Sequence, residues 1–267
     1  MERIGIVAGN GKLPHIASAY ARKKAHEVYI CAIKGEADAS LESSATKIIW
    51  VKLGELKKLA SFFKNNDVRT VCFAGKITKL SIFSGHVKPD LDMVLLFAKL
   101  KDKKDDTILG AICDYLVQKG IGVIDSTTFL HDCMPGKGVL TKKKPSKQQQ
   151  DDITFGWTLA KESACLDIGQ SVVVKDKAVL AIEAIEGTDE AIKRGGKLGY
   201  GDVVVVKVAK PQQDMRFDVP TIGPTTMGSM VEANACVLAY EAGKTLFVDY
   251  DDVIRIANKY HLVIMGL

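Results

Sequence analysis

The sequence lacks a long apolar run. Nowhere do about 18 apolar residues follow one another, which is roughly the length that a helix needs to span a bilayer. The opening MERIGIVAGNG has too short an apolar core for a signal peptide, and no small-residue cleavage pattern accompanies it. We therefore expect a cytoplasmic protein that at most touches a membrane.

Patterns for covalent or metal-cluster chemistry are also missing. The 6 cysteines include no CxxC pair and have no histidine at zinc-finger spacing, which favours reduced thiols. The 5 histidines show no metal spacing among themselves. Without a G-x-S-x-G elbow or a reactive cysteine, the sequence offers no evident nucleophile.

What the chain does have is length and a mild positive charge. Its 267 residues suffice for one large domain or two modest ones, each with its own core. A net charge of +5 favours anionic partners, such as phosphorylated metabolites or an acidic membrane face. No basic motif with interleaved aromatic residues is present, so we do not expect a nucleic-acid partner.

Strands alternate with helices in the first half. Helical patterns lie between short β-branched runs, and a helical stretch from 90 to 119 is broken by the charge run KDKKDD. The predicted strands cover 3–9, 27–33, 47–53, 69–75 and 121–126. The alternation predicts an α/β protein whose N-terminal domain, residues 1–132, contains a parallel, helix-covered sheet.

The composition then changes to glycine, proline, lysine and glutamine, so we predict a linker over residues 133–150. Its block KKKPSK is either a solvated loop or an electrostatic contact with anionic lipid headgroups. Residues 151–267 predict a separate mixed α/β domain. It would contain a strand hairpin through KDK, the apolar strand DVVVVKVAK and a long helix, TMGSMVEANACVLAYEAGK.

Two glycine-containing turns are candidate ligand sites. AGNGKLP, residues 8–14, lets a ligand approach the backbone at a helix N-terminus, which attracts phosphate. It departs from the dinucleotide fingerprint G-x-G-x-x-G because Pro14 replaces the third glycine. FAGKIT, residues 73–78, follows another predicted strand, and ligands bind at such ends of open α/β sheets. Either segment can also be a purely structural turn.

The second half has a polar cluster of its own. LDIGQ places Gln170 just before one predicted strand, and EAIEGTD places Glu183, Glu186, Thr188 and Asp189 after its hairpin partner. The last of these residues also read as a helix N-cap with acids in the first turn. A binding site and a structural cap are therefore both open here.

The most distinctive stretch is KPQQDMRFDVPTIG. Asp214, Arg216 and Asp218 alternate in it, so in an extended chain all three would project to one side. Two such carboxylates can share a divalent cation, and the arginine between them can hold a phosphate or neutralise them. Together with turns suited to phosphate, this favours metal-assisted hydrolysis of a phosphate ester or anhydride.

These motifs occur together in one known family. IGIVAGNGKLP, FAGKI, KDD at 104–106, LDIGQ, EAIEGTD and KPQQDMRFDVPTIG follow in this order over nearly the whole chain. In this the chain resembles the LpxI-type UDP-2,3-diacylglucosamine pyrophosphatases of Gram-negative lipid A synthesis. The resemblance implies a Rossmann-like N-terminal domain, a C-terminal domain of its own type, a substrate between them and a homodimer.

The resemblance also implies a reaction and its residues. Mg²⁺-dependent hydrolysis would yield UMP and lipid X, which is 2,3-diacylglucosamine 1-phosphate, by attack of water on the sugar-side phosphorus. The family's catalytic acid falls on Asp218, with Asp214 and Arg216 beside it and with both acids as metal ligands. A substrate that sits in a membrane implies peripheral contact with the inner membrane. The substrate contacts would be Gly9, Gly11, Gly75, Lys76, Ile77, Thr78, Gln170 and Thr188.

Two other classes of protein remain open from the sequence. A non-catalytic protein that binds nucleotide sugars or lipids would retain the substrate without releasing UMP. A nicotinamide-dependent oxidoreductase would bind NAD tightly and transfer hydride.

Overall fold

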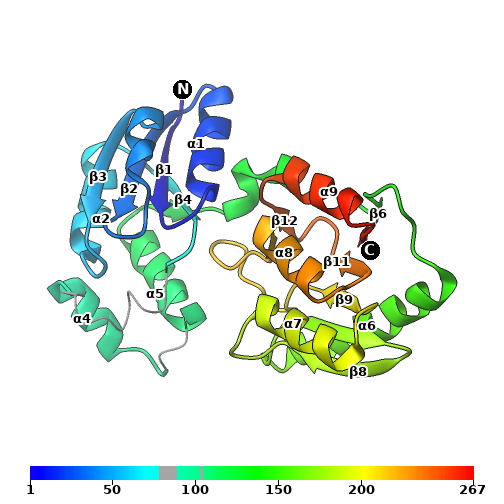
Figure 1. Cartoon of the computed structure of the whole chain (residues 1–267). Coiled ribbons are helices and arrows are strands. Elements are labelled where there is room, and N and C mark those ends of the chain that lie inside the picture. Colours follow the sequence, from blue (N-terminus) through cyan, green and yellow to red (C-terminus); the bar gives the residue numbers. More distant parts are fainter. Residues whose placement is uncertain (78–88, 103–104) are drawn as a thin grey trace. The chain divides into compact units, whose positions relative to one another are not determined.

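The computed structural model of the chain describes residues 1–77, 89–102 and 105–267. The chain divides into two compact units (Figure 1). Unit 1 comprises Met1–His131 together with Asp214–Asp218, and unit 2 comprises Asp132–Gln213 and Val219–Leu267. This differs from the predicted division in two ways. Residues 214–218 leave the second half to join unit 1, and the predicted linker is part of unit 2.

Unit 1 contains, within the described residues, a five-stranded parallel sheet in the order β3-β2-β1-β4-β5. The strand order reverses between β1 and β4, as in Rossmann-like folds, and this confirms the predicted fold class. The strands are β1 (Arg3–Ala8), β2 (Glu27–Ile33), β3 (Lys47–Val51), β4 (Thr70–Ala74) and β5 (Gly122–Val123).

Helices cover this sheet because its strands are apolar at successive positions. Val7 and Val71 pack in one cluster with Phe63 of α2 and Leu116 of α5, while α1 packs on β1, β2 and β4. The helices are α1 (Leu13–Lys23), α2 (Leu56–Asn65), α4 (Leu91–Ala98) and α5 (Asp105–Gln118), with 3-10 turns at Ala39–Ser44 and Ser126–Phe129. A third 3-10 turn, His131–Cys133, lies where unit 1 passes into unit 2.

Unit 2 contains a mixed sheet in the order β6-β13-β11-β9-β7-β8 among the described strands. β9, β11 and β13 are parallel, while β7 is antiparallel to both its neighbours and β6 is antiparallel to β13. The strands are β6 (Gly138–Val139), β7 (Ser171–Lys175), β8 (Ala178–Ile182), β9 (Val204–Lys207), β11 (Val237–Tyr240) and β13 (Val263–Gly266). Unit 2 also contains a separate sheet of two parallel strands, β10 (Thr221–Ile222) and β12 (Leu246–Phe247).

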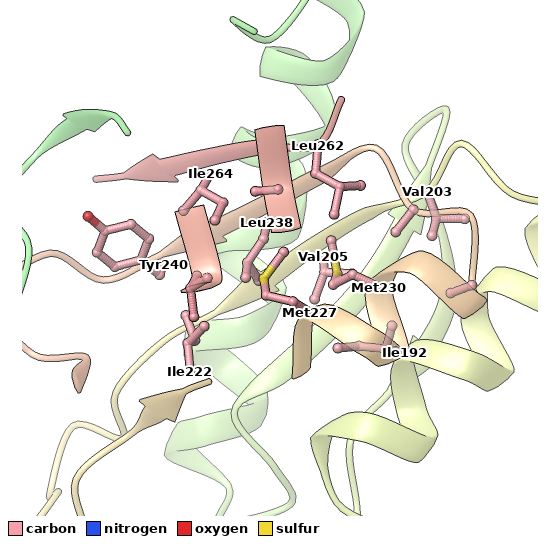
Figure 2. Close-up of a cluster of buried hydrophobic side chains, with 14 of the residues drawn as sticks. Ile192, Val203, Val205, Ile222, Met227, Met230, Leu238, Tyr240, Leu262 and Ile264 are labelled. Carbon is pink, nitrogen blue, oxygen red and sulfur yellow. The ribbon is translucent and has the colours of Figure 1, made fainter. Parts of the chain in front are cut away.

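Both faces of the unit 2 sheet are covered. α6 (Lys147–Cys165) packs on one face, where Ile153 and Ala160 meet the valines of β7 and β9. On the other face Ile192 and Met230 lie in one cluster with Val205 (Figure 2). A strand buried on both sides has no polar alternation, which explains the continuous valine runs. The helices of that second face are α7 (Thr188–Gly199), α8 (Pro224–Glu232) and α9 (Tyr250–Lys259).

The predicted linker is largely structured. β6 pairs with β13, and α6 begins inside the linker range at Lys147. A capping box starts this helix. The Ser146 hydroxyl accepts from the Gln149 N–H at 3.2 Å, and the Gln149 side chain accepts from the Ser146 N–H at 2.9 Å. The exposed lysines of KKKPSK precede it. No helix in the described part of the chain is both long and apolar enough to cross a membrane.

Candidate functional site

The glycine turns after β1 and β4 lie against each other in unit 1. The Asn10 N–H donates to the Lys76 carbonyl at 2.7 Å, and the Lys76 N–H donates back to Asn10 at 2.9 Å. A third bond, from the Gly9 N–H to the Ala74 carbonyl at 2.8 Å, ties the first turn to the end of β4. The two turns therefore form one backbone-bonded surface at the point where the strand order reverses, which is where Rossmann-like sheets bind ligands.

This approach requires glycine at two positions. A Cβ on Gly9 would lie 2.4 Å from the Lys76 carbonyl oxygen. A Cβ on Gly75, whose φ is +89°, would lie 2.6 Å from the Asn10 carbonyl oxygen. Both distances are far below any real contact. Gly11 differs, because its φ of +96° is left-handed but the space around it is open.

The chain on both sides of residues 214–218 belongs to unit 2. After β9, the Ala209 N–H donates to Glu241 at 2.8 Å, and Lys161 pairs with the same carboxylate. On the far side of the segment, the Pro220 carbonyl accepts from the Leu246 N–H at 2.8 Å, next to β10. One flank is thus held by the Glu241 carboxylate and the other by a backbone bond, and residues 214–218 between them belong to unit 1.

Within unit 1 the segment is attached to Ser126. The Ser126 N–H donates to the Met215 carbonyl at 3.0 Å. Its hydroxyl lies 2.6 Å from the Phe73 carbonyl, near the end of β4, and also within hydrogen-bonding distance of the Arg216 carbonyl. Phe217 packs against the core of the sheet. The segment therefore lies at the carboxyl-terminal end of β4, where Phe73 precedes Gly75 by two residues.

The segment is a turn, not the extended strand that its alternation suggested. The Asp214 carbonyl accepts from the N–H groups of both Phe217, at 3.2 Å, and Asp218, at 2.9 Å. The Asp214 carboxylate also accepts from the Arg216 N–H at 3.1 Å. These bonds close the chain over five residues.

Asp214 and Arg216 form a two-pronged ion pair. Arg216 Nε donates to Asp214 Oδ1 at 2.9 Å, and Nη2 donates to Oδ2 at 2.7 Å. Hydrogen bonding to Arg216 lowers the pKa of Asp214, and the same contact raises the pKa of Arg216. The arginine also lies over the Phe217 ring, 5.9 Å from its centroid. Both side chains are only about two-thirds buried, so the guanidinium keeps an accessible edge.

The donor set fits Mg²⁺ in a limited way. Among the described residues, no group of three or more His, Cys, Asp or Glu side chains is arranged to hold a metal ion. Mg²⁺ does not need such a group, because it is commonly held by one or two carboxylates together with substrate phosphates and waters. Asp218, at the end of the docked segment, is half-buried and has the carboxylate that such a role requires. Asp214 suits it less well, because Arg216 already occupies both its oxygens.

Unit 2 contains a second polar cluster, which includes two of the predicted contacts. Thr188, the first residue of α7, donates to Glu183 Oε1 at 2.9 Å and accepts from Lys207 Nζ at 2.9 Å. Ser171, next to Gln170, lies 3.4 Å from the same hydroxyl. Lys207 and Glu183 are only 5% and 9% exposed. The chain thus buries two charged groups here and links them through one threonine hydroxyl.

Three acceptors of this second cluster lack a donor. Gln170 Oε1, Glu183 Oε2 and Asp189 Oδ1 are buried without a hydrogen-bond partner in the described part of the chain. Buried acceptors are normally satisfied, so a donor from a bound molecule or water is expected at this place. Sequence reasoning had not selected Lys207, although a lysine that interrupts a valine run was a signal for it.

The structure therefore sorts the predicted site residues into two clusters. Gly9, Gly11, Gly75, Lys76 and Ile77 lie in the turns of unit 1, where the segment 214–218 also docks, while Gln170 and Thr188 lie in unit 2. Thr78 lies outside the described residues. Ser126 was not predicted as a site residue, and only its place at the end of the predicted strand 121–126, beside Asp125, pointed to it.

Comparison with known sequences decides the family. Residues 3–133 match the LpxI N-terminal domain, and residues 136–265 match the LpxI C-terminal domain. The chain belongs to the LpxI family. A curated relative of this LpxI chain is the UDP-2,3-diacylglucosamine pyrophosphatase LpxI of Caulobacter vibrioides. The two are 29% identical over 278 residues, which cover 100% of this chain and 98% of the relative.

Two solved structures resemble the chain remotely. An ADP complex of N5-carboxyaminoimidazole ribonucleotide synthetase has a TM-score of 0.29 at 13% identity, covering 65% of this chain and 32% of that one. The Thermotoga maritima enzyme of the same name has a TM-score of 0.25 at 14% identity, covering 70% and 42%. The LpxI chain spans less than half of either protein, and likenesses this low say nothing about its function.

Proposed function

We propose that this LpxI-family chain hydrolyses the pyrophosphate bond of UDP-2,3-diacylglucosamine and releases UMP and lipid X. The substrate is the one named for the Caulobacter relative, which aligns over its whole length. The products and a requirement for Mg²⁺ are carried over from the family resemblance. Asp218 is the catalytic carboxylate in this proposal.

One structural observation supports assigning the reaction to particular residues. The segment with Asp218 docks in unit 1, attached through Ser126 to Phe73, two residues before the Gly75 turn. Phosphorylated ligands of Rossmann-like sheets bind at this edge. A diphosphate that accepts from the backbone of the glycine turns would therefore lie near residues 214–218, which belong to unit 1.

The residues of the segment have different roles in the proposed hydrolysis. Asp218 orients a water molecule and accepts its proton as the water oxygen bonds to the sugar-side phosphorus. The bond from that phosphorus to the bridging oxygen breaks, and UMP leaves with that oxygen. Arg216, held in place by Asp214, presents its remaining N–H groups to the phosphate charge that develops. Asp218 would hold Mg²⁺ together with the substrate phosphates, and the bound ion would neutralise phosphate charge and lower the pKa of water.

The test is turnover of UDP-2,3-diacylglucosamine by the purified chain with Mg²⁺, with and without EDTA. Reaction in H₂¹⁸O shows which product gains the label, and we expect lipid X. Asp218→Asn and Asp218→Ala should lower kcat by about 1000-fold or more and leave substrate binding in place. The control is Asp251→Ala, because Asp251 is an exposed acid in the first turn of α9.

Each other outcome has a definite meaning. Label in UMP would move the attack to the other phosphorus and displace the proposed role of the segment. Binding of the lipid nucleotide without UMP release would make the chain a binding protein. Near-normal turnover by both Asp218 variants would remove the acid from the mechanism.

Two further proposals concern partners. A substrate with two acyl chains brings the chain to the inner membrane, and exposed Lys142, Lys143 and Lys144 are suited to anionic headgroups. Co-sedimentation with vesicles that contain anionic lipid should fall when all three become glutamate. A homodimer rests on the family resemblance alone. Light scattering of the purified chain tests it, and a monomer mass at assay concentrations would refute it.

A further inference from the structure

Ser126 occupies an unusual place in unit 1. It is the first residue of the 3-10 turn Ser126–Phe129, shortly after β5, and its exposed fraction is 6%. Asp125 fixes the turn, because its carboxylate accepts from the N–H of Thr127 at 2.8 Å and from the Thr127 hydroxyl at 2.6 Å. The backbone around Ser126 is therefore held independently of anything that its own side chain does.

Ser126 joins three parts of the chain that are far apart in sequence. Its N–H donates to the Met215 carbonyl, and its hydroxyl lies between the carbonyls of Phe73 and Arg216. The single hydroxyl hydrogen can bond to one of these carbonyls at a time. Phe73 belongs to β4, which leads into the Gly75 turn, and Arg216 lies two residues before Asp218.

We infer that Ser126 is a positioning residue, which sets the backbone at Arg216 relative to the end of β4 and thereby places Asp218 beside the glycine turns. The inference rests on the proposed function, since it assigns a residue to the site of that reaction. Ser126 would not touch the substrate. It would act through the segment that carries the acid.

Other contacts keep the segment docked when the hydroxyl is removed. Phe217 stays in the core, the Ser126 N–H still reaches Met215, and Asp214 still pairs with Arg216. Ser126→Ala should therefore shift or loosen the segment without releasing it. Misplacement of a reacting group by about 1 Å costs on the order of 100-fold in rate. We expect kcat to fall by about 10- to 100-fold with KM within about threefold.

The experiment compares Ser126→Ala with Ser126→Thr, which keeps the hydroxyl, and with Thr128→Ala. Thr128 lies in the same 3-10 turn, is exposed, and donates only to the Asp125 carbonyl among the bonds described. Ser126→Thr should recover at least part of the lost kcat, and Thr128→Ala should match the wild type. Ser126→Cys, with a weaker donor of similar size, replaces the threonine variant if the added methyl prevents folding.

Two measurements separate positioning from general damage. In Ser126→Ala, hydrogen exchange should quicken at the amides of Arg216, Phe217 and Asp218, while the amides of β1 and β4 keep their protection. In the double variant with Asp218→Ala, turnover should equal that of Asp218→Ala alone, because both changes act on one group.

The results distinguish this inference from the proposed function. If the wild type releases no UMP, the proposed function fails, and exchange in the segment alone decides whether Ser126 positions it. If the wild type is active and Ser126→Ala keeps its kcat, the inference fails and the function stands. Additive losses in the double variant, or exchange that quickens throughout unit 1, would also overturn it.

Discussion

The two polar clusters of this chain are built in opposite ways. In unit 1 the site is made of backbone: glycine turns that bond to each other, and carbonyls that hold the segment 214–218 through Ser126. In unit 2 it is made of buried side chains linked through Thr188. The first depends on glycines that let two backbones approach, and the second on charged side chains that are largely buried. Substitutions should therefore break the two clusters by different routes.

Two tryptophans allow each unit to be followed separately. Trp50 lies in β3 of unit 1 and Trp157 in α6 of unit 2, and the sequence has no other. Chemical unfolding of Trp157→Phe variants thus reports on unit 1, and unfolding of Trp50→Phe variants reports on unit 2. Each background must first unfold like the wild type.

The largest effect is expected for Gly75→Ala. A Cβ would meet the Asn10 carbonyl oxygen at 2.6 Å in a backbone conformation that disfavours side chains. The free energy of unfolding of unit 1 should fall by about 4 kcal/mol or more, and turnover should fall by about 100-fold or more. Gly120→Ala is the control, because its φ of +81° is similar but its surroundings are open, and about 1 kcal/mol is expected. Equal losses in the two variants would show that the contact between the turns is unimportant.

Lys207→Met should break the cluster of unit 2. The ammonium group is buried and donates to the hydroxyl that bonds Glu183, so its loss leaves a buried carboxylate without that support. We expect unit 2 to lose about 3 kcal/mol, measured through Trp157. Adding Glu183→Gln should restore part of the loss, because the remaining charge is removed. A double variant that is less stable than the sum of the single losses would argue against a linked pair.

Asp214→Asn should have a smaller effect that depends on pH. Because Arg216 lowers the pKa of Asp214 in the folded chain, the carboxylate stabilises unit 1 above its ordinary pKa of about 3.9. This stabilisation is lost as pH falls through the lowered value. The difference in unfolding midpoint between wild type and variant should stay constant from pH 7 to about pH 4 and shrink below it. A difference that already shrinks at pH 6 would mean that the pair does not form.

Ser146→Ala should have the smallest effect, about 1 kcal/mol in unit 2. The substitution removes the hydroxyl that caps α6 and leaves the rest of the helix unchanged. Unfolding followed through Trp157, within that helix, measures it. Ser43→Ala in unit 1 controls for loss of an exposed serine hydroxyl. If Ser146→Ala leaves the free energy of unfolding unchanged, the cap does not stabilise α6, and the linker that the composition suggested is favoured.

Local pattern was enough for most of unit 1 and for the hairpin of unit 2. Strands of β-branched residues between helical patterns led directly to the parallel sheet. The hairpin turn at Asp176 and Lys177 followed from KDK, and both residues adopt the left-handed conformation that such turns need. The turn glycines were also recognisable, because close backbone approach is a local property.

The prediction was wrong where burial removed the pattern. β11 was placed inside a long helix, because its residues are apolar on both sides and show no alternation. Asn234, with a φ of +47°, ends the helical path after α8 and was the signal to stop. The linker was drawn from composition, and the capping box at Ser146 was overlooked.

No local feature of the sequence indicated that residues 214–218 belong to unit 1. Their neighbours on both sides belong to unit 2, and the bonds that hold them reach back to Ser126 and Phe73. Alternation of Asp214, Arg216 and Asp218 suggested an extended chain, while the observed turn depends on a specific pairing of side chain and backbone. Such pairings follow from the tertiary fold, and no spacing along the chain reveals them.

The excursion of residues 214–218 fixes an order of events during translation. Unit 1 is nearly complete when His131 has left the ribosome, yet its last piece follows only after residues 132–213 have been made. The N–H and hydroxyl of Ser126, which later bond to this piece, stay without it until then, and contacts between residues so far apart in sequence form slowly. A nascent chain that ends before residue 214 has both glycine turns and lacks Asp214, Arg216 and Asp218. Unit 1 reaches its full set of residues only after most of the second half has been made.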